Sequence, residues 1–426
     1  MSKKLRIDGD DVRGVNRLVI EGILGVVDLV EAMHCNIAGS PGLRAKSRQP
    51  RTRGITGLVY RSIRGVTGLT GQGLDALLAR VAPLLGERSN SARREALLAA
   101  LNGVLGDHLA ASGNPLAITM RLRQGGLPLP DGRAALRTAL PQATGRLVVL
   151  VHGLCMNDLQ WTRKGHDHGA ALARDCTFTS VYLHYNSGLH ISTNGRAFAD
   201  LLEDLVRRWP VPLTELVLIG HSMGGLVARS ACDHAAQMRH QWLQRLDKLV
   251  FVGTPHHGAP LERGGNWIDT LLGSNAYSAP LARLGKIRSA GITDLRFGNL
   301  VDADWNERDR FERSGDRRVP VPLPEGVACY AIAATTGKVA GALGDRLIGY
   351  GIVPLASALG RHANQRLALT FDPSRQWVIR DTGHLDLLSR PEVYAQIRRW
   401  MEIPAQGSGS RVTAMRARGQ DRASTR

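Results

Sequence analysis

After Pro141, short runs of apolar and β-branched residues alternate with longer segments of helical period. Two of the helical segments cover residues 195–208 and 224–238. Apolar strands that alternate with helices form a mostly parallel sheet covered on both faces. Residues 145–402 are therefore predicted to form one α/β domain. The predicted strands are LVVLV at 147–151, SVYLHY at 180–185, LVLIG at 216–220, LVFVG at 249–253, CYAIA at 329–333 and WVI at 377–379.

The sequence outside these strands has a different pattern. Residues 1–140 are predicted to be an N-terminal helical region with a basic linker, since apolar residues recur there with helical period, for example over 92–111. Residues 403–426 are basic and poor in apolar side chains, which predicts a disordered tail. Residues 259–326 form a long insertion between two strands, a natural place for a cap over a site.

The formal net charge of +18 is concentrated near the two ends of the chain. Residues 1–145 carry a net charge of +9 and residues 403–426 one of +4. Between residues 42 and 64 there are seven cations and no acid, with Tyr60 as the single aromatic side chain. Such a run favours either peripheral contact with an anionic membrane or a solvated basic linker. A nucleic-acid partner is disfavoured, because the chain lacks a helix-turn-helix signature, zinc-ligand spacing and an aromatic platform.

The five cysteines are widely scattered, and no pair has zinc-ligand or redox spacing. This usage fits a reducing compartment. The start of the chain has no readable signal peptide, and no stretch of about 18 uncharged apolar residues occurs. The expected location is therefore the cytoplasm, with peripheral membrane contact as the alternative. His166 and His168 lack a third spaced ligand, so neither a metal nor a cofactor is predicted.

A glycine-rich turn, GHSMG at residues 220–224, lies where the predicted strand 216–220 meets the predicted helix 224–238. The pattern G-x-S-x-G alone is a weak signal, but this position makes it a strong one. A serine in such a turn has a strained backbone, and only small residues fit two positions before and after it. Ser222 is therefore predicted to expose its hydroxyl at the carboxyl edge of the sheet as a nucleophile.

Acyl transfer needs two backbone N–H groups that point at the oxygen on which negative charge develops. One usually belongs to the residue after the nucleophile, which here is Met223. The second usually comes from an earlier strand-to-loop turn. The sequence HGL at 152–154 follows the first predicted strand, so Leu154 is the expected second donor. His152 is interpreted as a brace for this turn rather than as a catalytic base.

The general base is expected late in the chain, in the order Ser, acid, His. The last predicted strand is followed by RDTGHLD at 380–386, which puts His384 on a turn at the same sheet edge. His384 is therefore predicted to be the base. His256 and His257 follow another strand end, but adjacent side chains point in opposite directions, which argues against a shared metal.

Five motifs in this order resemble those of a lipase-type α/β-hydrolase: LVVLVHGL, GHSMGGLVARS, VGTPHHGAP, GIVPLASALG and GHLDLL. They are similar to bacterial triacylglycerol lipases and to GPI inositol-deacylase-like hydrolases, and the resemblance covers residues 145–402. It implies the α/β-hydrolase fold, to which an N-terminal helical module and a cap insertion are added here. It also implies a Ser–His–Asp esterase. By this resemblance Ser222 of this chain is the nucleophile, His384 is the base, and Leu154 and Met223 are the oxyanion donors.

The catalytic acid departs from the family pattern. The family has Gly-Asp-Gly before Val-Pro, whereas this chain reads GYGIVP at 349–354, with Tyr350 where the acid is expected. A phenol with a pKa of about 10 is neutral at pH 7 and cannot stabilise an imidazolium as a carboxylate does. Asp345 is the predicted replacement, Glu262 is a more distant candidate, and the third outcome is an impaired enzyme. Asp345 as a purely structural loop residue stays an equal alternative.

The resulting prediction is a serine hydrolase that cleaves carboxylic esters, with a lipid-like small molecule as substrate, through an acyl-enzyme intermediate. The alternative is a catalytically impaired α/β-hydrolase scaffold that binds anionic membrane surfaces. The insertion at 259–326 mixes apolar residues with Arg and Gly, which suits either a lid over an acyl pocket or a surface subdomain. The motifs do not set the head group, the acyl length, or the choice between ester and thioester.

Overall fold

The computed structural model describes residues 13–14, 16–20, 92–258, 289–307, 315–337 and 353–403. The chain divides into two units, residues 1–94 with 109–117 and residues 95–108 with 118–426. The second unit contains the sheet.

Several sequence predictions fall outside the described residues. Asp345 and Glu262, the two candidates for the catalytic acid, are among them, and so is Tyr350 at the family's acid position. The basic run at 42–64, most of the insertion at 259–326 and all but the first residue of the tail are also outside. The predictions made for these segments stay predictions.

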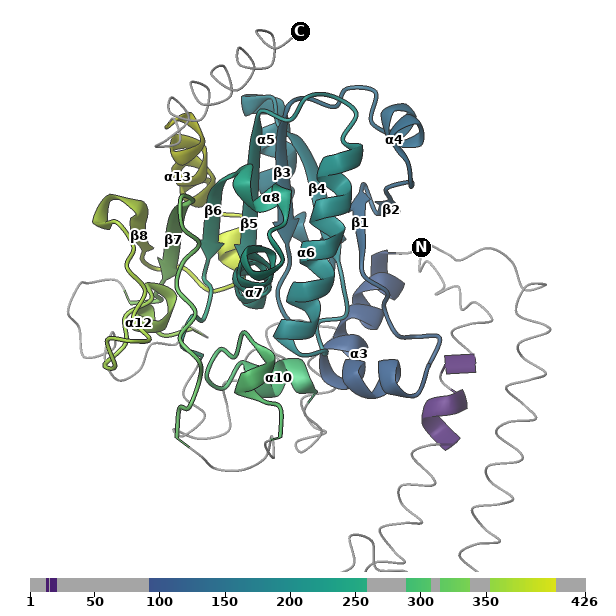
Figure 1. The fold of residues 1–426 in the computed structure, drawn as a ribbon, viewed down its shortest axis with the longest axis vertical. Helices are drawn as coiled ribbons and strands as arrows, with labels where there is room; N and C mark the ends of the chain where they lie inside the picture. The colour runs from purple at the N-terminus through teal and green to yellow at the C-terminus, as the bar shows by residue number, and fades with distance from the viewer. Residues whose placement is uncertain are drawn as a thin grey trace, which may run out of the picture. The chain divides into compact units, whose positions relative to one another are not determined.

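An eight-stranded sheet is formed by the described part of the second unit (Figure 1). Its strand order is β2-β1-β4-β3-β5-β6-β7-β8. β1 runs antiparallel to both of its neighbours, and all other neighbouring strands are parallel. The strands are β1 (Arg121–Gln124), β2 (Leu127–Pro128), β3 (Arg146–Val151), β4 (Thr179–His184), β5 (Glu215–His221), β6 (Leu246–Val252), β7 (Ala328–Ala334) and β8 (Gln376–Ile379).

Both faces of the sheet are buried. Along β3, Leu147, Val149 and Val151 belong to one apolar core, and Val148 and Leu150 belong to another. All five side chains are fully buried. A strand buried on both sides needs an uninterrupted apolar run, which is why LVVLV shows no polar alternation.

Helices cover the two faces of the sheet (Figure 1). The core on the Val149 face includes side chains of α4 (Arg133–Ala139), α6 (Ile191–Arg208) and α7 (Met223–Met238). The core on the Leu150 face includes side chains of α5 (His168–Cys176) and α13 (Pro391–Glu402). Further helices in the described part of the chain are α3 (Ala92–Ala111), α8 (Gln241–Gln244), α10 (Ala290–Asp294) and α12 (Leu355–Ala358).

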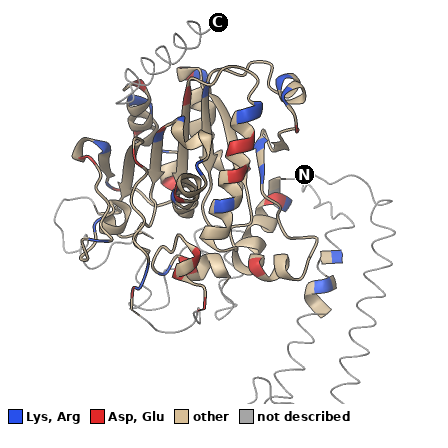
Figure 2. Ribbon diagram, viewed as in Figure 1, with Lys and Arg blue, Asp and Glu red and all other residues tan. Residues whose placement is uncertain are grey.

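Helix α6 illustrates how the surface is built. It buries Phe198, Leu202 and Leu205 against the sheet, and basic and acidic residues follow one another along its length (Figure 2). Two of these charges pair within the helix, because Arg208 Nε lies 2.7 Å from Asp204 Oδ2. Among the described residues no helix is long and apolar enough to cross a bilayer.

The sheet begins earlier in the chain than the sequence pattern predicts. The six predicted strands and the helix at 92–111 occur within three residues of their expected ends. However, β1 and β2 lie inside residues 1–140, for which the sequence predicts a helical region, and β1 pairs with β4. The reason is local, since RLRQ has a single fully buried side chain, Leu122, and so carries no apolar run.

Candidate active site

Ser222 occupies the junction between β5 and α7, and its backbone is strained. Its φ of 53° and ψ of −125° lie in a region that a side chain disfavours, at a cost of about 1–3 kcal/mol. The surroundings hold it there: Ser222 N–H donates to Val252 O at 2.9 Å, and Gly225 N–H donates to Ser222 O at 3.1 Å. The predicted nucleophile therefore sits at the carboxyl end of β5, at the N-terminus of a helix.

The two glycines of the GHSMG turn are required by close packing. A Cβ on Gly220 would lie 2.5 Å from Gly225 Cα, and a Cβ on Gly224 would lie 2.2 Å from Val151 O. Both neighbours are backbone atoms, which cannot turn aside. The spacing of the motif is therefore set by contact between the start of α7, the end of β5 and the end of β3.

The HGLC turn, residues 152–155, follows β3 and faces the GHSMG turn. A Cβ on Gly153 would lie 3.0 Å from Ser222 Cβ, so the two turns touch. Among the described residues, neither Leu154 N–H nor Met223 N–H has a backbone or side-chain acceptor. For Met223 this follows from its place in the first turn of α7, where N–H groups have no partner within the helix. Within the described residues both N–H groups thus lack a protein acceptor; Met223 directly follows Ser222, and Leu154 directly follows Gly153, which contacts Ser222.

His384 lies on the loop after β8, and its ring rests against β6. A Cβ on Gly253 would lie 3.0 Å from His384 Cε1 and 3.1 Å from His384 Nδ1. The ring is also 4.8 Å, centroid to centroid, from that of His221. Burial lowers the pKa of His384 to about 4, so the imidazole is neutral at pH 7. Its buried Nε2 has no hydrogen-bond partner among the described residues.

The structure brings Ser222 and His384 to two consecutive residues, the last of β6 and the one directly after it. Val252 accepts the hydrogen bond of Ser222, and the next residue, Gly253, contacts the His384 ring. No hydrogen bond joins the two side chains in the described contacts, a common state for catalytic groups without substrate. The free Nε2 is an imidazole nitrogen that can accept a proton.

No described carboxylate serves His384. Among the described residues no Asp or Glu oxygen lies within 4 Å of its ring nitrogens. Asp386, two residues on, instead pairs with Lys164, with 2.8 Å between Nζ and Oδ1. The orienting acid is thus not supplied by the described part of the loop that carries the base.

His152 is fully buried and contacts its own turn. Its ring stacks on that of Tyr185 with centroids 4.3 Å apart, and Nδ1 lies 2.9 Å from Gly153 O. Burial lowers its pKa to about 3, so it stays neutral at neutral pH. These contacts support its interpretation as a brace rather than a base.

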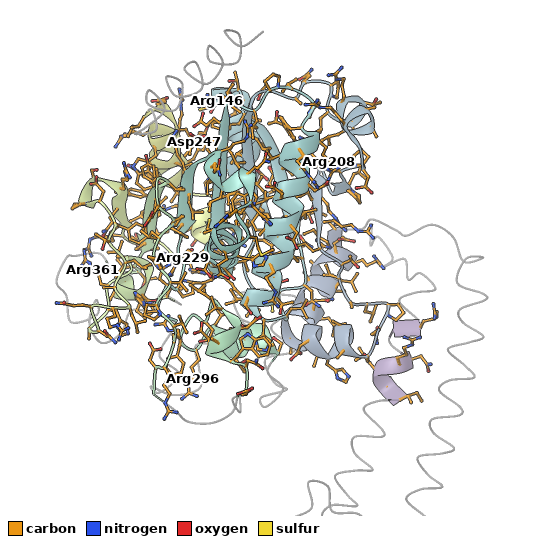
Figure 3. The ribbon with its side chains drawn as sticks, viewed as in Figure 1. Arg146, Arg208, Arg229, Asp247, Arg296 and Arg361 are labelled. Carbon is orange, nitrogen blue, oxygen red and sulfur yellow. The ribbon has the colours of Figure 1, made fainter. Side chains whose placement is uncertain are left out.

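The other histidine pairs have separate surroundings. His256 Nδ1 lies 3.2 Å from NH1 of Arg229 of α7, labelled in Figure 3, whereas His257 contacts Arg318. His166 Nε2 and His168 Nδ1 are 2.8 Å apart. Among the described residues no group of three or more His, Cys, Asp or Glu side chains could hold a metal.

Two residues that the sequence interpretation did not single out also contact the HGLC turn. Tyr185 and Ser187 follow β4, and both are buried. Tyr185 OH donates to His152 O at 2.8 Å, and Cys155 N–H donates to Ser187 Oγ at 3.1 Å. Their position in the sequence could have indicated them, because YNS at 185–187 directly follows β4, whose carboxyl end lies at the edge of the site.

The strand order, the strained serine after β5 and the histidine after β8 define an α/β-hydrolase fold. Residues 142–318 match the family model of the PGAP1-like alpha/beta domain. Over these residues the chain is similar to a PGAP1-like α/β domain, and its fold is that of the α/β-hydrolases. This match confirms the resemblance over the three motifs that lie within residues 142–318, whereas GIVPLASALG and GHLDLL lie beyond the matched residues.

Solved structures that resemble the chain have low sequence identity to it. The mature form of Bacillus licheniformis lipase BlEst2 is 15% identical, with a TM-score of 0.38 over 67% of this chain and 98% of that chain. A lipase-esterase related protein from Clostridium acetobutylicum ATCC 824 is 12% identical, with a TM-score of 0.34 over 61% and 95%. The RedJ thioesterase of Streptomyces coelicolor is 14% identical, with a TM-score of 0.34 over 65% and 90%. No curated protein matches the sequence.

Proposed function

We propose that this protein is a serine hydrolase that cleaves carboxylic esters, with lipid-like esters as the substrate class. Ser222 is the nucleophile, His384 the general base, and the N–H groups of Leu154 and Met223 the oxyanion donors. The observation that carries the proposal is the strained Ser222, whose N–H is bonded to the residue of β6 that precedes the contact with His384. Such strain persists only where the surrounding structure holds the residue in place, and strained residues cluster at active sites.

The chemistry follows from the protonation states. The neutral His384 imidazole takes the Ser222 hydroxyl proton as the oxygen attacks the ester carbonyl. Negative charge then develops on the carbonyl oxygen, and two N–H donors stabilise it. Collapse of the tetrahedral intermediate expels the alcohol, which receives the proton from the imidazolium. Water then hydrolyses the acyl-enzyme by the same steps.

The imidazolium formed in this cycle needs an acid partner, because burial alone disfavours the charged ring. We propose Asp345 for this role, since it precedes Tyr350 on the same segment after β7. In the wider proposal residues 145–402 act as the catalytic domain. The insertion at 259–326 serves as its cap, and residues 1–140 and 403–426 are accessory segments.

The location proposed for the protein is the cytoplasm. The support is that the four described cysteines, Cys155, Cys176, Cys232 and Cys329, are free thiols, as in proteins of reducing compartments.

The direct test is hydrolysis of p-nitrophenyl esters of graded acyl length by the full chain and by Ser222→Ala. We expect release of p-nitrophenol by the native protein and a loss of at least about 10³-fold in kcat for the variant. Equal rates would refute the assignment. If only the native protein is active, the dependence of its rate on acyl length would define the substrate class.

A second candidate is a non-catalytic scaffold whose basic segments bind anionic membranes. It is favoured by Tyr350 at the family's acid position and by the seven cations between residues 42 and 64. Salt-sensitive binding to vesicles that contain an anionic phospholipid, without any ester hydrolysis, would favour it. Hydrolysis that depends on Ser222 would contradict it.

A further inference from the structure

The HGLC turn is held at both ends by hydroxyl groups from one short segment after β4. At the start of the turn, Tyr185 OH donates to His152 O at 2.8 Å. At its end, Cys155 N–H donates to Ser187 Oγ at 3.1 Å. The two bonds therefore lie on either side of Gly153, which contacts Ser222, and of Leu154, which follows it.

The turn has a conformation that needs such support. Cys155 has a φ of 58°, in the left-handed region that residues other than glycine adopt only with strain. The N–H that Cys155 gives to Ser187 is the backbone group that directly follows Leu154 in the chain. The peptide unit that contains the Leu154 N–H lies between this unit and the one that carries His152 O, and each of these two is held by a hydrogen bond. Its orientation is therefore restricted from both sides.

The segment that carries the two hydroxyls is itself well anchored. Asn186, between them, donates from Nδ2 to Gly106 O of α3 at 2.9 Å and accepts from Gly188 N–H at 3.0 Å. A Cβ on Gly291 would lie 2.2 Å from Ser187 O, so α10 packs directly against it. Ser187 thus presents its Oγ from a fixed backbone, as a positioning group should.

We propose that Tyr185 and Ser187 are positioning residues for the oxyanion hole. They hold the HGLC turn so that the Leu154 N–H points at the oxygen that becomes negatively charged during attack by Ser222. The proposal rests on the proposed hydrolase function and adds two residues that do not touch the substrate. Donors of this kind interact more strongly with an oxyanion than with a neutral carbonyl, so misalignment should lower kcat and leave KM nearly unchanged.

The test uses two variants that remove a hydroxyl and little else. Tyr185→Phe keeps the ring that stacks on His152, and Ser187→Ala leaves a methyl group in place of the hydroxymethyl. Each is expected to lower kcat for a p-nitrophenyl ester by about 10- to 100-fold, less than the loss of a whole oxyanion donor. KM should stay within about twofold. Ser187→Thr, which restores a hydroxyl, should recover most of the activity.

A matched control separates positioning from general stability. Ser230 of α7 is also buried and donates from Oγ to Leu300 O at 2.6 Å, but it has no contact with either turn in the described structure. Ser230→Ala therefore removes a comparable hydrogen bond elsewhere. It should lower the melting temperature about as much as Ser187→Ala does, with kcat unchanged when assayed well below that temperature.

A second readout reports on the oxyanion directly. Butylboronic acid forms a tetrahedral adduct with an activated serine, and an oxygen on boron then occupies the oxyanion position. Its inhibition constant should rise in Tyr185→Phe and Ser187→Ala by the same factor as kcat/KM falls, and should not change in Ser230→Ala. Both variants behaving like Ser230→Ala would overturn the positioning role while leaving the hydrolase proposal intact. An inactive native protein would instead refute the hydrolase proposal itself. If Ser187→Ala does not fold, Tyr185→Phe alone decides the outcome.

Discussion

The N–H of Ser222 donates a hydrogen bond of 2.9 Å to the carbonyl oxygen of Val252. This bond extends the pairing of β5 and β6 by one residue, into the strained turn itself. The next residue, Gly253, directly follows β6 and contacts the His384 ring. The nucleophile and the base therefore contact two consecutive residues at the end of β6. The position of Ser222 relative to His384 therefore depends on a central strand of the sheet and not only on the conformation of the loop that carries His384.

Gly253→Ala should impair catalysis more than stability. Gly253 has a φ of +64°, and an added Cβ would lie 3.1 Å from His384 Nδ1 and 2.8 Å from Leu387 Cδ1. The base must shift to make room, and a displacement of about 1 Å can cost about 10²-fold in rate. We expect kcat for a p-nitrophenyl ester to fall by about that factor.

Gly125→Ala is the control for this prediction. Gly125 has a similar φ of +58°, but an added Cβ would meet no atom within 4 Å. This variant carries the same backbone strain, about 1 kcal/mol in unfolding free energy, without the clash. Loss of activity in both variants to the same extent would contradict the account of Gly253.

The pH dependence of kcat/KM should reflect the buried base. Burial lowers the pKa of His384 to about 4, whereas an exposed histidine titrates near 6.5. The proposed Asp345 carboxylate raises this pKa above the value that burial alone gives. The acidic limb should therefore have its midpoint between about pH 4 and about pH 6.5, and it should move to lower pH in Asp345→Ala. A pH–rate profile whose acidic limb has its midpoint near 6.5 would contradict a base that is desolvated in the free enzyme.

The same group links stability to pH. The unfolded chain binds a proton at His384 below about pH 6.5, but the folded protein binds one only near pH 4. Between these values the unfolded state holds more protons, so the unfolding free energy should fall as the pH falls. Urea unfolding of the native protein and of His384→Gln at pH 7 and pH 5 should show a smaller pH-dependent loss in the variant. An equal loss in both proteins would show that other groups account for it.

The fold and the position of Ser222 can be predicted from the sequence because they depend on local patterns. Apolar runs indicate the parallel strands. The GHSMG turn indicates Ser222, because a Cβ added at either glycine would lie only 2.5 Å or 2.2 Å from a backbone atom. The sequence does not predict β1, because this short strand has the sequence RLRQ and so contains no apolar run.

The supports of the HGLC turn could not be predicted in the same way. Tyr185 and Ser187 bind backbone atoms about 32 or 33 residues away in the chain, and a hydroxyl that contacts distant backbone leaves no periodic signal in the sequence. Their assignment needs the parallel pairing of β3 with β4. That pairing places the two strand ends next to each other.

The acid should be Asp345 and not the residue at the family position. Asp345→Ala is expected to lower kcat by about 10⁴-fold, the usual effect of losing the acid of such a triad. Glu262→Ala should change it little, and Tyr350→Asp should bring no large gain. Steady-state kinetics of the three variants decide the matter. A large gain in Tyr350→Asp with no loss in Asp345→Ala would show that the triad is broken in this protein.

The most direct test of the central claim is covalent labelling of the full chain with a fluorophosphonate, followed by mass spectrometry of the peptide that contains residue 222. A serine activated by a neighbouring imidazole displaces fluoride from this reagent, whereas an ordinary serine does not. The account predicts one adduct on Ser222 in the native protein, a strongly slowed reaction in His384→Ala, and none in Ser222→Ala. A native protein that forms no adduct, or an adduct that persists in Ser222→Ala, would contradict it.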